Sequence, residues 1–229
     1  LFLALLHGVM FKSHHLVRNT VRISVTSDFN CPWCWVGKKN LDKAIACTTG
    51  VVFQVTWNPY FLDPTIPLEG YDKLKHYDSK YGPSYRKTWE RMMGRLNKFG
   101  VEVNLIEGSV LANTQNAHRL SHYIQTRHGW ERQHAVQEVL FRWNHTEGRN
   151  ISLVSELVAA AAEVGVHDQD LIQYLESTED VELFTDLEAR SKARGVDGVP
   201  HFQFDAHCVT GAVDPSDLEQ AFQRALAVK

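Results

Sequence analysis

Hydrophobic and polar residues alternate near both ends of the chain, in the pattern of half-buried β-strands. Residues 21–27 (VRISVTS) and residues 51–57 (VVFQVTW) alternate in this way and are rich in β-branched side chains. Between them, Leu41, Ala44 and Ile45 fall at helical spacing. This order predicts a β-α-β unit, whose strands run parallel because a helical crossover joins them.

The C-terminal end predicts two short strands followed by a helix. HFQF (residues 201–204) and CVT (residues 208–210) are strand candidates on either side of the turn residues DAH. The following segment, residues 214–228, opens with Asp214 before Pro215, and a proline at the first helical position is a strong helix start. We therefore expect the chain to close with a β-β-α unit.

The long middle of the chain has the period of helices. Its apolar residues recur every three or four positions in three stripes. These are Tyr85, Trp89, Met92, Met93, Leu96 and Phe99; Val136, Val139, Leu140 and Trp143; and Leu153, Leu157, Val158 and Ala161. Core packing explains such stripes better than a cofactor site does. Proline- and glycine-containing linkers at 62–70 and 193–198 bound this section.

These elements together predict an α/β protein with a thioredoxin-like fold and a large all-α insertion. The thioredoxin-like part is expected to comprise residues 21–61 and 195–229, and the helical insertion residues 62–194. The composition agrees with a sizeable core, since 44% of the 229 residues are hydrophobic. A formal net charge of -3 leaves no basic surface for nucleic acid or an anionic membrane, so we predict neither as a partner.

Residues 1–20 differ in composition from the rest of the chain. The run LFLALLHGVMF is apolar but far too short to span a bilayer. No acidic residue precedes Asp28, while Lys12, Arg18 and Arg22 are basic. This composition is found in organelle transit segments, in clipped signal peptides and in disordered leaders. We expect a leader or disordered segment here and a cytoplasmic or mitochondrial location.

Four cysteines are too few for a disulfide-stapled scaffold of this length. Cys31 and Cys34 are the one pair that is close in sequence, within DFNCPWCWVGKKNL. The isolated Cys47 and Cys208 are predicted to be buried free thiols, which behave as small hydrophobic residues. A zinc site of four cysteines would need a second pair. We therefore predict no metal, and no cofactor beyond a redox-active disulfide, with glutathione as a candidate co-substrate.

The place of Cys31 in the predicted β-α-β unit indicates its chemistry. It follows a strand directly and stands where a helix begins, with Pro32 in the first turn. The N–H groups and the dipole of a helix N-terminus stabilise a thiolate, so Cys31 is the predicted nucleophile. Cys34 lies one turn later on the same face, close enough for a disulfide. Because Trp33 and Trp35 flank it, Cys34 should be less exposed and is the predicted resolving thiol.

Several motifs together resemble one family. SDFNCPWCWVGKKNL, WNPYFLDPTIPLEG, NTQNAHRL and GVPHFQF, followed by VTGAVDPSDLEQAF, are similar in type and order to the FrnE-like branch of the DsbA family of thiol-disulfide oxidoreductases. The resemblance implies a thioredoxin fold with a helical insertion, Cys31 as nucleophile and Cys34 as resolving cysteine. It also implies a cis peptide bond between Val199 and Pro200, in a loop beside the dithiol that can bind an extended partner chain.

The implied partners are protein thiols and disulfides or glutathione, for a monomer or a homodimer. Pro32, Trp33 and the Val199–Pro200 loop are expected to support the dithiol. Asp28 could relay protons from Cys34, or it could bind backbone N–H groups of its own turn. His201 could tune the dithiol or play a structural part.

Another three residues match the family motif NTQNAHRL, and they are expected to hold the insertion onto the thioredoxin-like part. They are Asn113, His118 and Arg119.

Two other functions remain open at this point. Kappa-class glutathione transferases and hydroxychromene-carboxylate isomerases share this fold and insertion, but they typically have serine at the position of Cys31. A non-catalytic binding module could also use the fold as a scaffold. The intact pair of cysteines favours the oxidoreductase.

Overall fold

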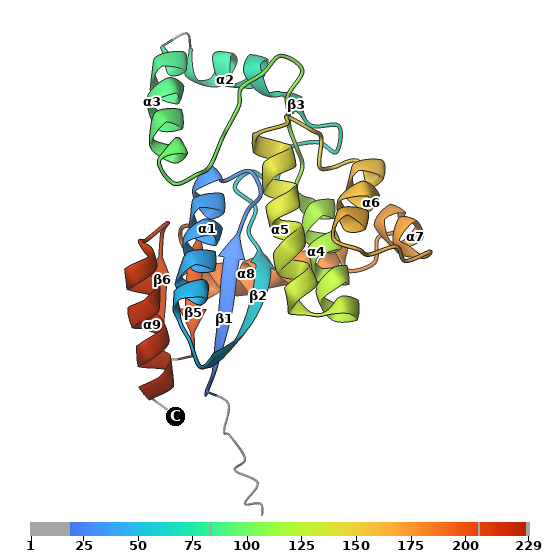
Figure 1. The fold of residues 1–229 in the computed structure, drawn as a ribbon. Helices are drawn as coiled ribbons and strands as arrows, with labels where there is room; N and C mark the ends of the chain where they lie inside the picture. Colours follow the sequence, from blue (N-terminus) through green and yellow to red (C-terminus); the bar gives the residue numbers. More distant parts are fainter. Residues whose placement is uncertain (1–18, 83, 206, 228–229) are drawn as a thin grey trace, which may run out of the picture.

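The computed structural model describes residues 19–82, 84–205 and 207–227 (Figure 1). The predicted leader therefore lies outside the described residues, apart from Asn19 and Thr20, which open the first strand. A four-stranded sheet has the order β2-β1-β5-β6. Its strands are β1 (Asn19–Ser27), β2 (Val51–Pro59), β5 (His201–Phe204) and β6 (His207–Thr210). β1 pairs in parallel with β2 and antiparallel with β5, and β5 pairs antiparallel with β6.

Two helices complete the predicted units of this sheet. Helix α1 (Pro32–Cys47) joins β1 to β2, and helix α9 (Pro215–Ala227) follows β6. The predicted β-α-β and β-β-α units are therefore both confirmed, and together they form a thioredoxin-like α/β fold. The parallel register begins with Asn19 opposite Val51 and ends with Ser27 opposite Pro59.

Alternation along the strands gives the sheet one apolar and one polar face. The apolar face packs against α1 and α9, and its strand residues are Val21, Ile23, Val25, Phe53, Val55, Trp57, Phe202 and Phe204. The other face carries polar residues such as Ser24 and His201, and helix α8 (Val181–Ala193) crosses it (Figure 1). The backbone N–H of Phe61, just after β2, donates a 3.0 Å hydrogen bond to Glu188 of α8.

In the described part of the chain, seven helices lie between β2 and β5. The six besides α8 are α2 (Lys73–Tyr81), α3 (Tyr85–Asn97), α4 (Gln115–His128), α5 (Trp130–His145), α6 (Val154–Glu163) and α7 (Leu171–Glu176). The three predicted stripes lie on α3, α5 and α6, although Phe99 and Leu153 fall just beyond their helices. The insertion also holds a short antiparallel pair, β3 (Tyr71–Asp72) with β4 (Val110–Leu111). Residues 62–194 remain our proposed extent of the insertion.

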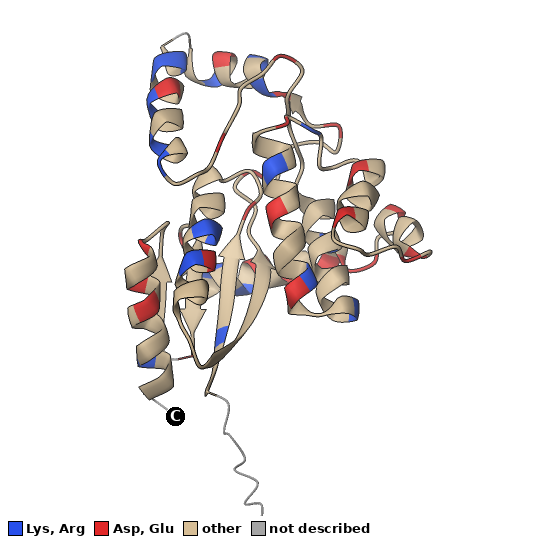
Figure 2. Cartoon of the chain, viewed as in Figure 1, with Lys and Arg blue, Asp and Glu red and all other residues tan. Residues whose placement is uncertain are grey.

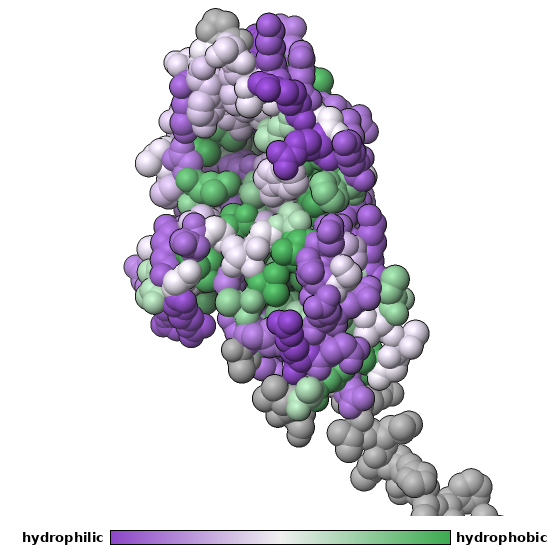
Figure 3. Space-filling model, turned by 90° about the vertical axis from the view of Figure 1, so that its left-hand side faces the viewer, coloured by the Kyte–Doolittle hydropathy of each residue, from purple (hydrophilic) through white to green (hydrophobic). Residues whose placement is uncertain are grey.

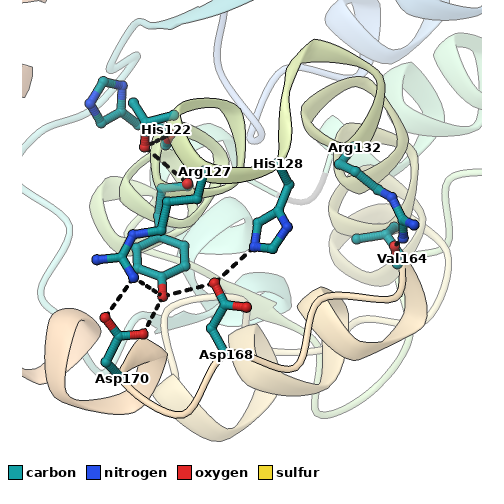
Figure 4. Close-up of polar contacts among 9 residues, drawn as sticks. His122, Arg127, His128, Arg132, Val164, Asp168 and Asp170 are labelled. Atoms are coloured by element: carbon teal, nitrogen blue, oxygen red, sulfur yellow. Dashed lines mark hydrogen bonds and ion pairs between the residues drawn. The ribbon is translucent and has the colours of Figure 1, made fainter.

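Charged contacts tie the end of α4 to the loop between α6 and α7 (Figure 4). Arg127 donates a 2.6 Å hydrogen bond to Asp170, and His128 lies 2.8 Å from Asp168. Arg132 of α5 bonds the Val164 carbonyl at the end of α6. These contacts hold α4 and α5 to α6 and to the loop that follows it. No helix within the described ranges is long and apolar enough to cross a membrane.

Candidate active site

Cys31 caps the N-terminus of α1. Its backbone is extended (φ −96°, ψ 106°), and Pro32 follows in the first helical turn, where a missing N–H costs nothing. The Cys31 N–H donates to the Asp28 carbonyl at 3.0 Å, and the Cys34 N–H donates to the Cys31 carbonyl at 3.0 Å. The first turn of α1 has no acidic residue, and its ribbon is tan in Figure 2. Cys31 therefore stands at the positive end of the α1 dipole, and the first turn of this helix carries no carboxylate.

The loop before β5 brings its backbone to this sulfur. The Val199–Pro200 peptide bond is cis, as the family resemblance implied. Cys31 Sγ lies 3.8 Å from the Val199 carbonyl oxygen, within hydrogen-bonding range for a thiol. Gly37 of α1 permits the close approach, because a Cβ atom there would lie 2.7 Å from Cγ of Pro200. Residues 168 positions apart in the chain thus share one site.

Cys34 is fully buried, whereas Cys31 retains a small exposed fraction of 7%. Both cysteines are thiols in this structure. Burial raises the pKa of the Cys34 thiol and the adjacent Cys31 sulfur raises it further, while the Ser27 hydroxyl and the Asp28 backbone oppose the rise. Cys34 is therefore a protonated thiol near neutral pH, and Cys31 is the sulfur that a substrate can reach.

Asp28 is buried and bonded to backbone N–H groups. One carboxylate oxygen accepts from Asn30 at 3.2 Å, and the other accepts from Leu62 at 2.7 Å. His118 of α4 lies 3.9 Å from the carboxylate, and its ring packs against that of Phe29. This geometry supports the backbone-binding interpretation of Asp28. It also joins the turn before Cys31 to the helical insertion, as we expected of His118.

The other two motif residues act within the insertion. Asn113 donates a 2.6 Å hydrogen bond to the Ile66 carbonyl. Arg119 is 1% exposed, and its guanidinium donates to the Glu179 and Leu175 carbonyls at 2.9 Å and 3.0 Å. Arg119 therefore fastens α4 to the segment that leads into α8, instead of contacting the dithiol.

Trp33, between the two cysteines, contacts the insertion. Its ring meets the ring of Phe99 edge-on at 6.2 Å between centroids, and the Arg95 guanidinium lies 5.4 Å from its ring centre. Helices α2 and α3 lie above this end of α1 (Figure 1). Figure 3 shows hydrophobic residues gathered across the hollowed middle of this side of the molecule. The site is thus bounded by the thioredoxin-like part and the insertion together.

His201 lies on the polar face of the sheet, away from α1. Its Nδ1 atom is 2.7 Å from the hydroxyl of Thr210 on β6. Burial lowers the pKa of His201, so the ring is neutral around neutral pH. Its neighbour Phe202 points to the opposite face and packs against α1. The arrangement favours a structural part for His201.

The prediction that Cys47 and Cys208 are buried is wrong, because both are exposed. Cys47 is the last residue of α1, and it lies beyond Ala44, the last buried residue of that helix. Cys208 lies on β6, the edge strand, where alternation turns its side chain outward.

Sequence reasoning also missed a group of buried polar residues beside the dithiol. Asn144 of α5 donates to the Phe29 carbonyl at 2.8 Å and so anchors the turn before Cys31. Lys73 of α2 donates to the Asn144 carbonyl at 3.0 Å. Lys73 stands in no motif that carries chemistry. Polar residues on a helix suggest a solvated face, and only packing shows that these are buried.

This fold and this pair of thiols define a class of proteins: thioredoxin-like proteins with a Cys-x-x-Cys pair at the start of a helix. Residues 22–223 match the DSBA-like thioredoxin domain, and the chain belongs to that family. The FrnE-like branch within the family stays a prediction.

Solved structures of known proteins share the fold. A probable DsbA oxidoreductase from Streptomyces coelicolor is 24% identical, with a TM-score of 0.79 over 91% of each chain. A 2-hydroxychromene-2-carboxylate isomerase is 18% identical, with a TM-score of 0.62 over 89% of this chain and 95% of its own. The cytosolic disulfide reductase DsbM from Pseudomonas aeruginosa, solved with glutathione, is 16% identical, with a TM-score of 0.57 over 90% and 96%. At these identities the likeness concerns the fold.

Proposed function

We propose that the protein is a thiol-disulfide oxidoreductase that exchanges disulfides with protein thiols or glutathione through Cys31 and Cys34. The observation that carries the proposal is the position of Cys31. Its sulfur stands at a helix N-terminus, 3.8 Å from the Val199 carbonyl, with a fully buried second thiol one turn behind it. A nucleophilic sulfur and a resolving sulfur are the two parts that the exchange needs.

The exchange proceeds in two balanced steps when the substrate is a disulfide. The Cys31 thiolate attacks one substrate sulfur, forms a mixed disulfide and releases the other substrate sulfur as a thiolate. Cys34 then gives its proton to the released substrate thiolate or to water and attacks the sulfur of Cys31, which releases the second substrate thiolate. The protein loses two electrons and ends with a Cys31–Cys34 disulfide, while the substrate gains those electrons. The reverse sequence oxidises a substrate dithiol.

The first prediction concerns the two cysteines. We expect Cys31→Ser to abolish the reduction of insulin disulfides, because the attacking sulfur is gone. Cys34→Ser should accumulate mixed disulfides with substrate, visible by mass spectrometry, because the resolving attack is missing. Cys47→Ser, at the exposed end of the same helix, is the matched control and should retain full activity.

The alternative function is a glutathione-dependent transferase or isomerase, which the shared fold with the 2-hydroxychromene-2-carboxylate isomerase favours. Such an enzyme would not need two sulfurs. Equal turnover in the Cys31→Ser and Cys34→Ser proteins would therefore refute the oxidoreductase and support the transferase or isomerase.

A further inference from the structure

Lys73 is a buried cation without a carboxylate partner. It is the first residue of α2 and is 3% exposed. Its ammonium donates to the carbonyl and the side-chain oxygen of Asn144, at 3.0 and 3.3 Å. Among the described residues, no carboxylate forms an ion pair with it. An ammonium has three N–H donors, so one donor and the whole charge stay uncompensated by the protein. Burial lowers the pKa of Lys73 to about 8, which still leaves it mostly protonated at neutral pH.

Two further polar atoms near Lys73 are buried without a hydrogen-bond partner in the described part of the chain. They are the indole Nε1 of Trp89 on α3 and the imidazole Nε2 of His145, the last residue of α5. Trp89 is 9% exposed and His145 is 4% exposed. Burial and the charge of Lys73 lower the pKa of His145 to about 3, so its ring is neutral. Unpartnered groups this deeply buried are rare and call for an explanation.

Lys73, Trp89 and His145 all line one cavity of about 180 Å³. Pro32 and Trp33, the two residues between the cysteines, line it as well. Tyrosine side chains from α2 and α3 form much of the remaining wall. The cavity thus combines an aromatic wall, one cation and an indole donor, directly beside the dithiol. Ligand sites typically have this composition, with mostly apolar walls and a few polar groups that orient the ligand.

We propose that this cavity binds the carboxylate of a low-molecular-weight thiol or disulfide whose sulfur reacts at Cys31. The inference rests on the proposed exchange function and names its substrate class. A carboxylate supplies the negatively charged partner that the Lys73 ammonium lacks, and it accepts a hydrogen bond from the Trp89 N–H. The apolar part of the ligand then lies against the tyrosines. The volume suits a short carboxylate-bearing chain, such as one end of glutathione, and not a folded protein segment.

The test compares two disulfides on the reduced protein. Glutathione disulfide carries carboxylates, and bis(2-hydroxyethyl) disulfide carries none. The second-order rate of dithiol oxidation is followed for each by rapid-mixing tryptophan fluorescence. We expect Lys73→Met to slow the reaction with glutathione disulfide about tenfold or more, because a charge-assisted hydrogen bond is lost. The reaction with the hydroxyethyl disulfide should stay within about twofold of the wild-type rate.

Two further variants complete the design. Trp89→Phe keeps the ring and loses the N–H, and it should slow the glutathione disulfide reaction alone, by about threefold or more. Lys75→Met is the matched control, since it removes the same charge from an exposed position on the same helix. It should change neither rate by more than about twofold, because exposed charges are screened.

The outcomes separate this inference from the function on which it rests. A wild-type dithiol that reacts with neither disulfide would refute the proposed function. In that case the cavity is tested separately, by titration calorimetry with S-methylglutathione. Binding to the wild type that is lost in Trp89→Phe would still support the cavity as a binding site. The inference would be overturned if Lys73→Met and Trp89→Phe slowed the reactions with both disulfides equally. It would also be overturned if neither variant slowed the reaction with glutathione disulfide.

Discussion

At the scale of single residues, the site depends on the unequal surroundings of two sulfurs. Cys31 lies at the end of α1 against the Val199 carbonyl, while Cys34 lies inside the core. Burial raises the pKa of Cys34, whereas Cys31 stands at the N-terminus of α1 and keeps a small exposed fraction. Two cysteines three positions apart are therefore suited to different steps: Cys31 to the attack on a substrate sulfur, and Cys34 to the resolution of the mixed disulfide.

This difference predicts the order of alkylation. In a protein that carries Cys47→Ser and Cys208→Ser, iodoacetamide at about pH 6 should modify Cys31 first. Cys34 should react only as the pH is raised into the alkaline range, and more slowly, because its sulfur is protonated and buried. The two substitutions are needed because both outer cysteines are exposed. Peptide mass mapping measures the order, and labelling of Cys34 before Cys31 would contradict it.

At the scale of elements, the site depends on how closely α1 approaches the loop before β5. Gly37 lies in the middle of α1, where a glycine normally weakens a helix by about 1 kcal/mol relative to alanine. Here the missing side chain leaves room for Pro200 and for the ring of Phe202. The gain is a contact that places the Val199 carbonyl against the Cys31 sulfur.

Gly37→Ala should therefore destabilise the protein despite the better helix propensity of alanine. The new Cβ atom would lie 2.7 Å from Cγ of Pro200, and overpacking of this kind costs about 1 to 3 kcal/mol. We expect a net loss of about 1 kcal/mol in the free energy of unfolding, measured with urea, and slower disulfide exchange.

Gly94→Ala on α3 is the control for this substitution. A Cβ atom there meets nothing within 4 Å, so the helix propensity of alanine should act alone. That variant should be as stable as the wild type or more so. Higher stability and unchanged exchange in Gly37→Ala would show that the contact with Pro200 does not position the loop.

At the scale of the whole molecule, α1 joins the thioredoxin-like part to the insertion through α5. Trp35 donates a 3.1 Å hydrogen bond to Glu138, and its ring stacks on that of Phe141 with 6.3 Å between centroids. Asp42 of α1 lies 2.5 Å from His134 of α5 and 2.8 Å from Lys38. The helical insertion is thereby held in place beside the dithiol.

The Asp42 contacts predict a pH-dependent part of the stability. Burial alone would raise the pKa of Asp42, but the hydrogen bond from His134 and the charge of Lys38 outweigh it and lower the pKa to about 2. The stabilisation is therefore complete above the unfolded-state pKa of about 3.9 and is lost as the pH falls from about 4 to about 2. Because the Asp42 side chain is 40% exposed, solvent screening limits the contribution to about 1 kcal/mol.

Asp42→Asn should accordingly lower the free energy of unfolding by about 1 kcal/mol at pH 7. The difference from the wild type should shrink as the pH falls below about 4. Urea denaturation at a series of pH values measures both quantities. A difference that stays constant down to pH 3 would mean that the carboxylate charge is not what stabilises the contact.

Local patterns determined most of the fold by themselves. The alternation in residues 21–27 and 51–57 predicts two strands, and the proline after Asp214 predicts a helix start. Both predictions depend only on residues that are neighbours in the sequence. The spacing of Cys31 and Cys34 places both on one helical turn for the same reason. The cis bond at Val199–Pro200 was expected from family resemblance and agrees with the structure.

Tertiary structure alone decided which residues meet and which are buried. The Val199 carbonyl approaches the Cys31 sulfur only because β5 pairs with β1, and this pairing joins distant parts of the chain. Lys73 and Trp89 line one cavity because α2 and α3 pack over α1, although the sequence around Lys73 is that of an ordinary surface helix. The burial of Lys73 likewise depends on which helices cover it, and the polar residues around it in the sequence do not predict that burial.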